Sequence, residues 1–378
     1  MKNSDIIVRI ENILQIKDIL GKLDQLSPTD LQSLLLALYE KRSEKITVQS
    51  VFDQYGTNRF VRPSDVSQRL FTEVELLAFD LLPSDFDILE LSPVVPFGAN
   101  SVLTKNNQKK IMSTVRNLEV CADSTTALIL ECARQRKNLL RSNAKDDQNV
   151  KCATSMRNIR LQNFESIPGF VPHFKALTLA TAGRDCGSEA FEIQACLEHV
   201  TFYLDYLTHL SQRSFWIGDI IVAFSDIRIM EKLIELLNLE REQLGRVTQD
   251  SGFDVFRNFQ IPLPMSVKST DEMPDEFIQA YGLEKSFSFL SVVEEKVMKL
   301  LIHKYPRISF SIDLGRIAGI GYYSNLCFKI ATRNQRGDIF PLVDGGMVDW
   351  TQKLLQSRKE RAFVSGFGTE LFCHNFKK

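Results

Sequence analysis

Apolar residues recur at steps of three and four along the start of the chain. Ile6, Ile10 and Leu14 follow this spacing, which is typical of an amphipathic helix. A second helix is predicted to begin at residues 27–30, where a serine precedes a proline and a leucine-rich run follows. We therefore predict a helical N-terminal appendage over residues 1–59. It serves either for packing and dimerisation or for recognition of a partner.

From about residue 60 the apolar pattern alternates between helical and strand periodicity. Helices are predicted at 71–82, 124–136, 189–210, 229–239, 288–304 and 348–357, and strands at 87–91, 115–120, 156–162, 174–182, 217–224, 308–314, 322–332 and 362–367. Neighbouring strands joined by hairpins favour an antiparallel sheet. The predicted fold class is therefore α+β, with an antiparallel sheet flanked by helices.

Composition narrows the class of protein. The 378 residues include 46 basic and 47 acidic ones, so no global field draws a polyanion to the chain. Seven cysteines form no C-x-x-C pair, and five histidines show no metal-ligand spacing, which indicates reduced thiols and no metal site. No apolar run approaches the ~20 residues of a membrane span. We expect a cytoplasmic, metal-free globular protein.

Candidate chemistry lies in four separated segments. The first is an apolar helix followed by residues 87–93, which end in proline. The second is a pair of predicted strands around Arg160. The third contains Tyr322 and Tyr323 and precedes a predicted turn at Gly345 and Gly346. The fourth is the Gly-Phe-Gly stretch at residues 366–368.

This order of motifs resembles the catalytic core of class II aminoacyl-tRNA synthetases. Within them it is similar to the histidyl branch, which includes the regulatory subunit of ATP phosphoribosyltransferase. The resemblance covers about residues 60–378. It implies a class II synthetase-like core with a helical insertion at about residues 211–304. In that family the first segment forms the seam of a dimer, so the resemblance also implies a homodimer.

For the second segment the resemblance implies a binding role for Arg160. In the family this arginine holds the phosphate of ATP and the carboxylate of an amino acid, and a guanidinium fork suits both anions. The family usually has an acid where Gln162 stands. Its arginine-acid-phenylalanine run is Pro172-His173-Phe174 here, so only the phenylalanine is retained. His173 either contacts the ligand or has a surface or structural role.

The third segment lacks a family cation. The histidyl branch carries an arginine where this chain has Ala318, and its tyrosines shape the amino-acid pocket, as Tyr322 and Tyr323 are expected to do. Losing one such donor costs roughly 3–4 kcal/mol of transition-state stabilisation. Arg316 lies two residues earlier and can substitute only if the strand is regular.

The glycine motifs match the family, but the cations beside them do not. Gly345 and Gly346 are expected in a turn that brings the backbone close to the amino acid, with Met347 where the family often has an arginine. In the fourth segment Gly366 and Gly368 match the strand that lies under adenine. Leu371 replaces the family arginine there, which leaves Glu370 to repel a triphosphate.

A further segment resembles the family's ammonium-binding loop. An acid and a threonine there hold the amino-acid ligand, and Asp123 with Thr125 or Thr126 are the candidates in this chain. The same residues can equally form the cap of a helix.

The matches and departures together predict a catalytically reduced class II synthetase-like protein. It would bind a small ligand, an amino acid or a nucleotide, and act as a regulatory or partner-binding subunit. No residue is assigned a catalytic role. The family's anticodon-binding domain would follow the last motif, and only seven residues follow Leu371, so tRNA is not expected as a partner.

Two alternatives remain open. One is an active enzyme that forms an acyl-adenylate for an acceptor other than tRNA, and ATP with Mg²⁺ is expected only in that case. The other is a pure interaction protein in which the pocket is vestigial and filled by its own side chains.

Overall fold

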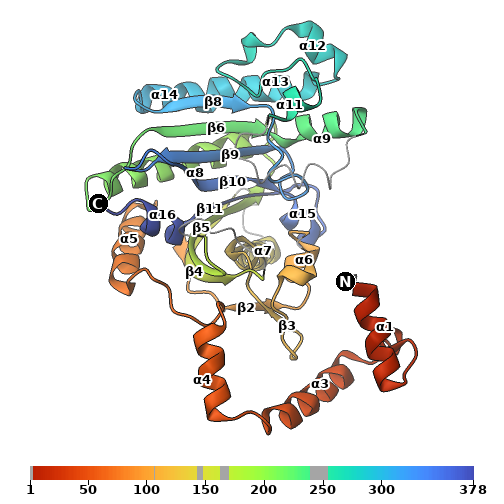
Figure 1. Ribbon diagram of the computed structural model, residues 1–378. Coiled ribbons are helices and arrows are strands. Elements are labelled where there is room, and N and C mark those ends of the chain that lie inside the picture. Colours follow the sequence, from red (N-terminus) through yellow and green to blue (C-terminus); the bar gives the residue numbers. More distant parts are fainter. Residues whose placement is uncertain (1–2, 106, 143–147, 162–169, 239–253) are drawn as a thin grey trace.

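The computed structural model describes residues 3–105, 107–142, 148–161, 170–238 and 254–378. It is built around a nine-stranded sheet in the order β1-β4-β5-β11-β10-β9-β6-β8-β7, with β2 and β3 paired separately (Figure 1). The strands are β1 (Asp87–Ile88), β2 (Val94–Pro96), β3 (Leu118–Val120), β4 (Val150–Ile159), β5 (His173–Arg184), β6 (Ile220–Asp226), β7 (Ser266–Val267), β8 (Ser309–Asp313), β9 (Leu326–Arg333), β10 (Ile339–Val348) and β11 (Glu360–Phe367). Within the large sheet β1 runs parallel to β4 and β6 parallel to β8, and the other neighbours are antiparallel. The predicted α+β class is confirmed.

Helices cover both faces of this sheet. They are α5 (Gln68–Leu81), α6 (Ala99–Val102), α7 (Ser124–Arg141), α8 (Ala190–Ser211), α9 (Ile227–Leu236), α11 (Val255–Asn258), α12 (Asp275–Ala280), α13 (Glu284–Val293), α14 (Lys299–Lys304), α15 (Trp350–Leu355) and α16 (Thr369–Asn375). Short turns of 3₁₀ helix occupy Gln108–Lys110 and Thr270–Glu272, and one π turn, Glu294–Met298, joins α13 to α14. No helix in the described ranges is long and apolar enough to cross a membrane.

Strand alternation divides the core into two layers. On β11, Phe363 and Phe367 join the core cluster that contains α5 and α8, whereas Ala362 and Val364 join the cluster that contains α7. Successive side chains of a strand point to opposite faces, so one strand builds both layers. The small residues lie on the α7 side, which lets that helix approach the sheet.

Four helices precede the core: α1 (Asn3–Leu14), α2 (Ile19–Asp24), α3 (Pro28–Ser43) and α4 (Val48–Thr57). They extend away from the sheet as an arm (Figure 1). The helix starts are specified locally, since Ser27 accepts from the Asp30 amide at 3.1 Å and Thr47 from the Ser50 amide at 3.1 Å. No described side chain at residues 5–70 is buried.

Several predicted elements differ from the observed ones. The strand predicted at 156–162 begins earlier, at Val150, and ends at Ile159, and the strand predicted at 115–120 is β3 at Leu118–Val120. The strand predicted at 87–91 is only the two residues of β1. The strand predicted at 322–332 begins at Leu326, because Gly319 and Gly321 with φ of 99° and 78° turn the chain through the two tyrosines. Gly345 and Gly346 lie inside β10, which the sequence pattern did not predict, and not in a turn.

The segment predicted as an insertion, residues 211–304, begins with a sheet strand. Its strand β6 pairs with β9 on one side and β8 on the other. The rest of the segment supplies α9, which follows β6, the edge strand β7, and the helices α11 to α14 (Figure 1). The division into an appendage, a core and an insertion stays a prediction.

Candidate functional site

A cavity of about 640 Å³ lies where β4, β5, β10 and β11 meet the start of α7 and the two tyrosines. Seven of the predicted site residues line it: Asp123, Thr125, Arg160, Tyr322, Tyr323, Gly366 and Gly368. They come from segments as much as 245 residues apart, counted from 123 to 368. The fold therefore brings together most of the residues that the motifs predicted. Gln162 lies outside the described residues.

Asp123 is the centre of a polar network on one wall of the cavity. Its carboxylate accepts from the Thr125 amide at 3.1 Å and the Thr125 hydroxyl at 2.7 Å, which caps α7. It also accepts from the Tyr322 hydroxyl at 3.2 Å and from Arg160 Nη2 at 3.3 Å. Arg160 Nε donates to the Ala122 carbonyl at 2.8 Å. The capping role of Asp123 is confirmed, and the same carboxylate faces the cavity.

The tyrosines are packed and remain protonated. Burial, followed by the nearby charge of Asp123, raises the pKa of Tyr322 well above its ordinary value, so its phenol is a hydrogen-bond donor at neutral pH. The Tyr322 ring meets Tyr323 and Trp350 edge-on, at centroid distances of 4.8 Å and 5.0 Å. A Cβ on Gly319 would lie 2.5 Å from the Tyr323 ring, so a glycine is required there.

Arg316 does not line the cavity. It is 4% exposed, forms an ion pair with Asp344 and donates from Nε to the Ala318 carbonyl at 2.9 Å. The regular strand that would have placed it on the same face as Ala318 is absent, because β8 ends at Asp313. Its charge is therefore engaged by an acid of the protein.

Glu370 is neutralised within the protein. It is 1% exposed, lies 3.1 Å from Arg157 Nη2, accepts from the Lys175 amide at 3.2 Å and contacts the Ser64 hydroxyl. The sequence interpretation left this acid without a cation and missed Arg157. The sequence did offer a signal, because Arg157 lies three residues before Arg160 on a predicted strand. A buried acid such as Glu370 requires a cation of this kind as its partner.

His173 makes contacts within the protein. Arg157 Nη1 lies 2.9 Å from its Nδ1, and its Nε2 lies 2.7 Å from the carbonyl oxygen of Arg62. It is not among the residues that line the cavity. This arrangement fits the structural role considered for it and ties the end of the arm to β5.

The four predicted glycines divide into two pairs. A Cβ on Gly345 would lie 2.6 Å from Phe328 Cε1, and one on Gly346 would lie 2.6 Å from Cys327 Cβ, so both are needed for packing under β9. Neither lines the cavity. Gly366 and Gly368 form part of its wall, where the nearest atom to an added Cβ lies at 3.8 Å and 3.4 Å.

Several polar groups of the wall were not predicted, among them Lys105, Asn158 and Asp344. Asn158 is 1% exposed, lines the cavity and has no described hydrogen-bond partner for its Oδ1. Asp344 adds a second carboxylate. Asn158 and Asp344 have no sequence signal of their own, because each is one polar residue of a strand and matches none of the motifs.

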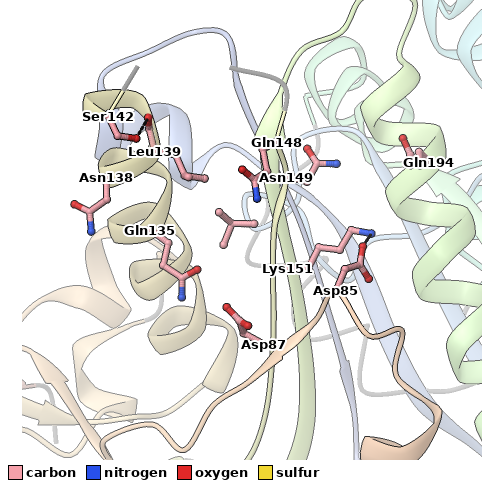
Figure 2. A pocket seen from close by; sticks show the side chains of 11 residues that line it. Asp85, Asp87, Gln135, Asn138, Leu139, Ser142, Gln148, Asn149, Lys151 and Gln194 are labelled. Carbon is pink, nitrogen blue, oxygen red and sulfur yellow. Dashed lines mark hydrogen bonds and ion pairs between the residues drawn. The ribbon is translucent and has the colours of Figure 1, made fainter. Parts of the chain in front are cut away.

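A second, larger cavity of about 870 Å³ lies between α7 and the start of β4 (Figure 2). Its polar side chains include Asp87, Gln135 and Lys151, and the Lys151 ammonium is already paired with Asp85 at 2.7 Å and Glu198 at 2.5 Å. No predicted site residue lines it. Across the described parts of the chain, no group of three or more potential ligand side chains is placed to hold a metal ion.

Comparison with solved structures identifies the fold. A structure of an ATP phosphoribosyltransferase regulatory subunit/histidyl-tRNA synthetase from Bacillus halodurans matches with a TM-score of 0.55 and 13% identity over 81% of this chain and 79% of that one. Histidyl-tRNA synthetase from Nostoc sp. PCC 7120 matches with a TM-score of 0.58 and 15% identity over 85% of this chain and 76% of that one. A histidine–tRNA ligase subunit from Alicyclobacillus acidocaldarius matches with a TM-score of 0.59 and 11% identity over 83% of this chain and 96% of that one. No family model and no curated protein matches the sequence.

The chain therefore has a class II aminoacyl-tRNA synthetase-like fold. More particularly, it is similar to the form of that fold found in histidyl-tRNA synthetases and in the regulatory subunit/synthetase structure. The resemblance inferred from the motifs is confirmed at the level of the fold.

Proposed function

We propose that this protein binds a small ligand in the 640 Å³ cavity and acts as a regulatory or partner-binding subunit of the cytoplasm, with reduced catalytic capacity. The observation that carries the proposal is the open, polar cavity around Asp123, Arg160 and Tyr322, three residues that hold one another in place. A vestigial pocket filled by its own side chains is disfavoured by this open volume. The seven free cysteines agree with a reducing compartment.

Charge favours an amino acid over a triphosphate. Asp123, Asp344 and the unpaired Asn158 Oδ1 are acceptors, which suit an ammonium or amide group of the ligand. Arg160 and Lys105 are the cations of the described lining and suit a single carboxylate. The ammonium and carboxylate of an amino acid match the acceptors and the cations of the cavity, respectively. The negative charges of a triphosphate would be repelled by the carboxylates of Asp123 and Asp344.

The missing family cations support reduced catalysis. Met347 is 2% and Leu371 9% exposed, so apolar side chains are packed at two of those positions. Arg316 is engaged by Asp344 and Glu370 by Arg157. One donor stabilises the negative charge of a transition state by roughly 3–4 kcal/mol, so the loss of these cations should slow adenylate formation strongly.

Calorimetric titration with each standard amino acid and with ATP tests the proposal. We expect heat with one amino acid or a few related ones, and at least tenfold weaker binding in Arg160→Met. The matched control is Arg134→Met, on the exposed face of α7. Among the described residues Arg134 is paired only with Glu131, so this variant should bind normally. Trp350 packs on Tyr322, so its fluorescence gives a second readout. Absence of heat with every amino acid and nucleotide would reject ligand binding.

The alternative is an enzyme that forms an acyl-adenylate for an acceptor other than tRNA. Arg160 at the cavity favours it. ATP with Mg²⁺ fits these residues poorly, since Leu371 presents no charge where the family has an arginine. Amino-acid-dependent pyrophosphate exchange that is lost in Arg160→Ala would support the enzyme.

We also propose a homodimer through the segment that runs from α5 to β2. Leu76 and Ile88 are exposed by 57% and 46% on it, and Phe97, which directly follows β2, is exposed by 57%. A protein that sediments as a monomer at all concentrations would contradict this assembly.

A further inference from the structure

The N-terminal arm carries a large uncovered apolar surface. Of the 26 exposed large apolar side chains in the described residues, 14 lie at residues 8–55. On α4 the residues Val48, Val51, Phe52 and Tyr55 are exposed by 89%, 58%, 70% and 51%. Their spacing places them on one face of the helix. We refer to these four residues as the α4 stripe.

The neighbouring helix has a second stripe of equal length. Leu31, Leu34, Leu35 and Leu38 repeat the same spacing on α3, and Leu34 and Leu38 are 48% and 47% exposed. We refer to these four as the α3 stripe. The two helices diverge from their joint at residues 44–47, so neither stripe covers the other (Figure 1).

The base of the arm is attached to the core. His173 Nε2 lies 2.7 Å from the Arg62 carbonyl, and Ser64 contacts the buried Glu370. The arm therefore projects from a defined point, with helices of 10 and 16 residues whose apolar faces meet water. A helix as short as α4 is marginal without a packing partner.

Charge and sequence together indicate what that partner is. Residues 1–59 contain eight Lys or Arg and eight Asp or Glu, so the arm has no net positive charge to attract a nucleic acid or an anionic membrane. The chain itself carries two apolar stripes of matching length. In a two-fold dimer the α4 stripe of each copy can pack on the α3 stripe of the other, and every stripe is then covered.

The exposure of the stripes agrees with this arrangement. Six of the eight stripe residues in each copy are exposed by 47–89%, and Leu31 and Leu35 are half-buried. Small stable interfaces bury roughly 600 Å² per partner, so the contact also needs the polar flanks of the helices. We propose that the arms of two copies exchange, the α4 stripe of one seating on the α3 stripe of the other. This proposal does not depend on a ligand in the cavity.

The reciprocity of the contact gives a specific test. Leu38→Glu alters only the α3 stripe and Phe52→Lys only the α4 stripe, and neither side chain is buried within its own chain. Each variant alone spoils both contacts of its own dimer. When the two variants are mixed one to one, a mixed dimer forms one contact between two unaltered stripes. Its second contact places the Glu of Leu38→Glu opposite the Lys of Phe52→Lys.

Sedimentation velocity and amide hydrogen exchange are measured on the full chain over a range of concentrations. We expect α3 and α4 amides to gain protection as concentration rises. Each variant alone should reduce that protection at least tenfold, and the mixture should recover it. A dimer held only by the segment from α5 to β2 would still sediment as a dimer in both variants, so the arm amides distinguish the two contacts. Leu300→Gln, an equally exposed change on α14 at 55%, is the matched control and should behave as the unaltered chain.

Three outcomes would overturn the proposal. Arm amides that exchange rapidly at all concentrations would show that the stripes stay uncovered. Protection independent of concentration would show that they fold onto their own chain. Loss of association in both variants without recovery in the mixture would point to a different contact, including one made by another protein.

Discussion

The ion pair between Arg136 on α7 and Glu360 on β11 gives a prediction with a defined magnitude. Arg136 is 0% and Glu360 1% exposed, so both charges are removed from water. Arg136 Nε and Nη2 each lie 3.0 Å from a different oxygen of the carboxylate, and Nη1 donates to the Gln148 carbonyl at 2.7 Å. The pair joins the helix that carries the site's cap to a strand of its wall.

Arg136→Met retains most of the volume but leaves the Glu360 carboxylate buried and unpaired. Breaking a buried pair in this way typically costs about 3–5 kcal/mol. That is a large part of the ~5–15 kcal/mol that holds a typical folded domain. The double variant Arg136→Met/Glu360→Leu removes both charges, and much of the loss should be recovered because no charge remains to be desolvated.

Urea unfolding of the natural chain, both single variants and the double variant forms a double-mutant cycle. The exposed pair of Arg134 and Glu131 on the same helix is the control, and Arg134→Met should cost less than about 1 kcal/mol. A loss below about 1 kcal/mol for Arg136→Met, or additive single losses in the double variant, would show that the buried pair does not stabilise the fold as reasoned.

Three further predictions concern the core beside the cavity. Burial, then the charge of Lys151, lowers the pKa of His199 to about 3, so only the unfolded chain takes up this proton between pH ~6.5 and ~3. The unfolding free energy should therefore fall by about 1.4 kcal/mol per pH unit as pH drops through that range, and His199→Gln should flatten the slope measured in urea. Gly346→Ala should lower the free energy of unfolding by roughly 1–3 kcal/mol through overpacking. Gly366→Ala should leave the thermal midpoint nearly unchanged, because the nearest atom to its added Cβ lies at 3.8 Å. Equal effects of the two substitutions would contradict the packing argument. Glu370→Gln removes the charge paired with Arg157 and should cost about 1–3 kcal/mol in chemical unfolding, and a stability equal to that of the natural chain would mean that this pair contributes nothing.

Local patterns predicted the element types well where one periodicity dominated. The long helices α7 and α8 and the strands β6 and β11 were expected near their observed positions, because caps and apolar spacing act within a few residues. β10 was missed, since its Gly345 and Gly346 suggest a turn. Only the ring of Phe328 and the β carbon of Cys327 beside them explain why glycine stands in a strand there.

The candidate site shows the same division. Motif order was enough to bring Asp123, Arg160 and Tyr322 into one prediction, and the fold does place them together. The pairing of Arg316 with Asp344 could not be predicted, because it depends on where β8 ends and on a strand that was not expected. The sequence shows that a residue is charged, but which opposite charge it pairs with depends on the distance between the two side chains in the folded protein.

By itself, the sequence determined the helical arm, the α+β core and the residue types available for binding. These follow from side-chain spacing and capping, which are properties of short segments. Only the tertiary structure decided which charges are free. Arg160 faces the cavity and is paired with Asp123, and Glu370 is neutralised by Arg157. Among the residues that the structure describes, none covers the apolar faces of the arm. Electrostatics and burial depend on neighbours that are distant in sequence, and only folding brings those neighbours into contact.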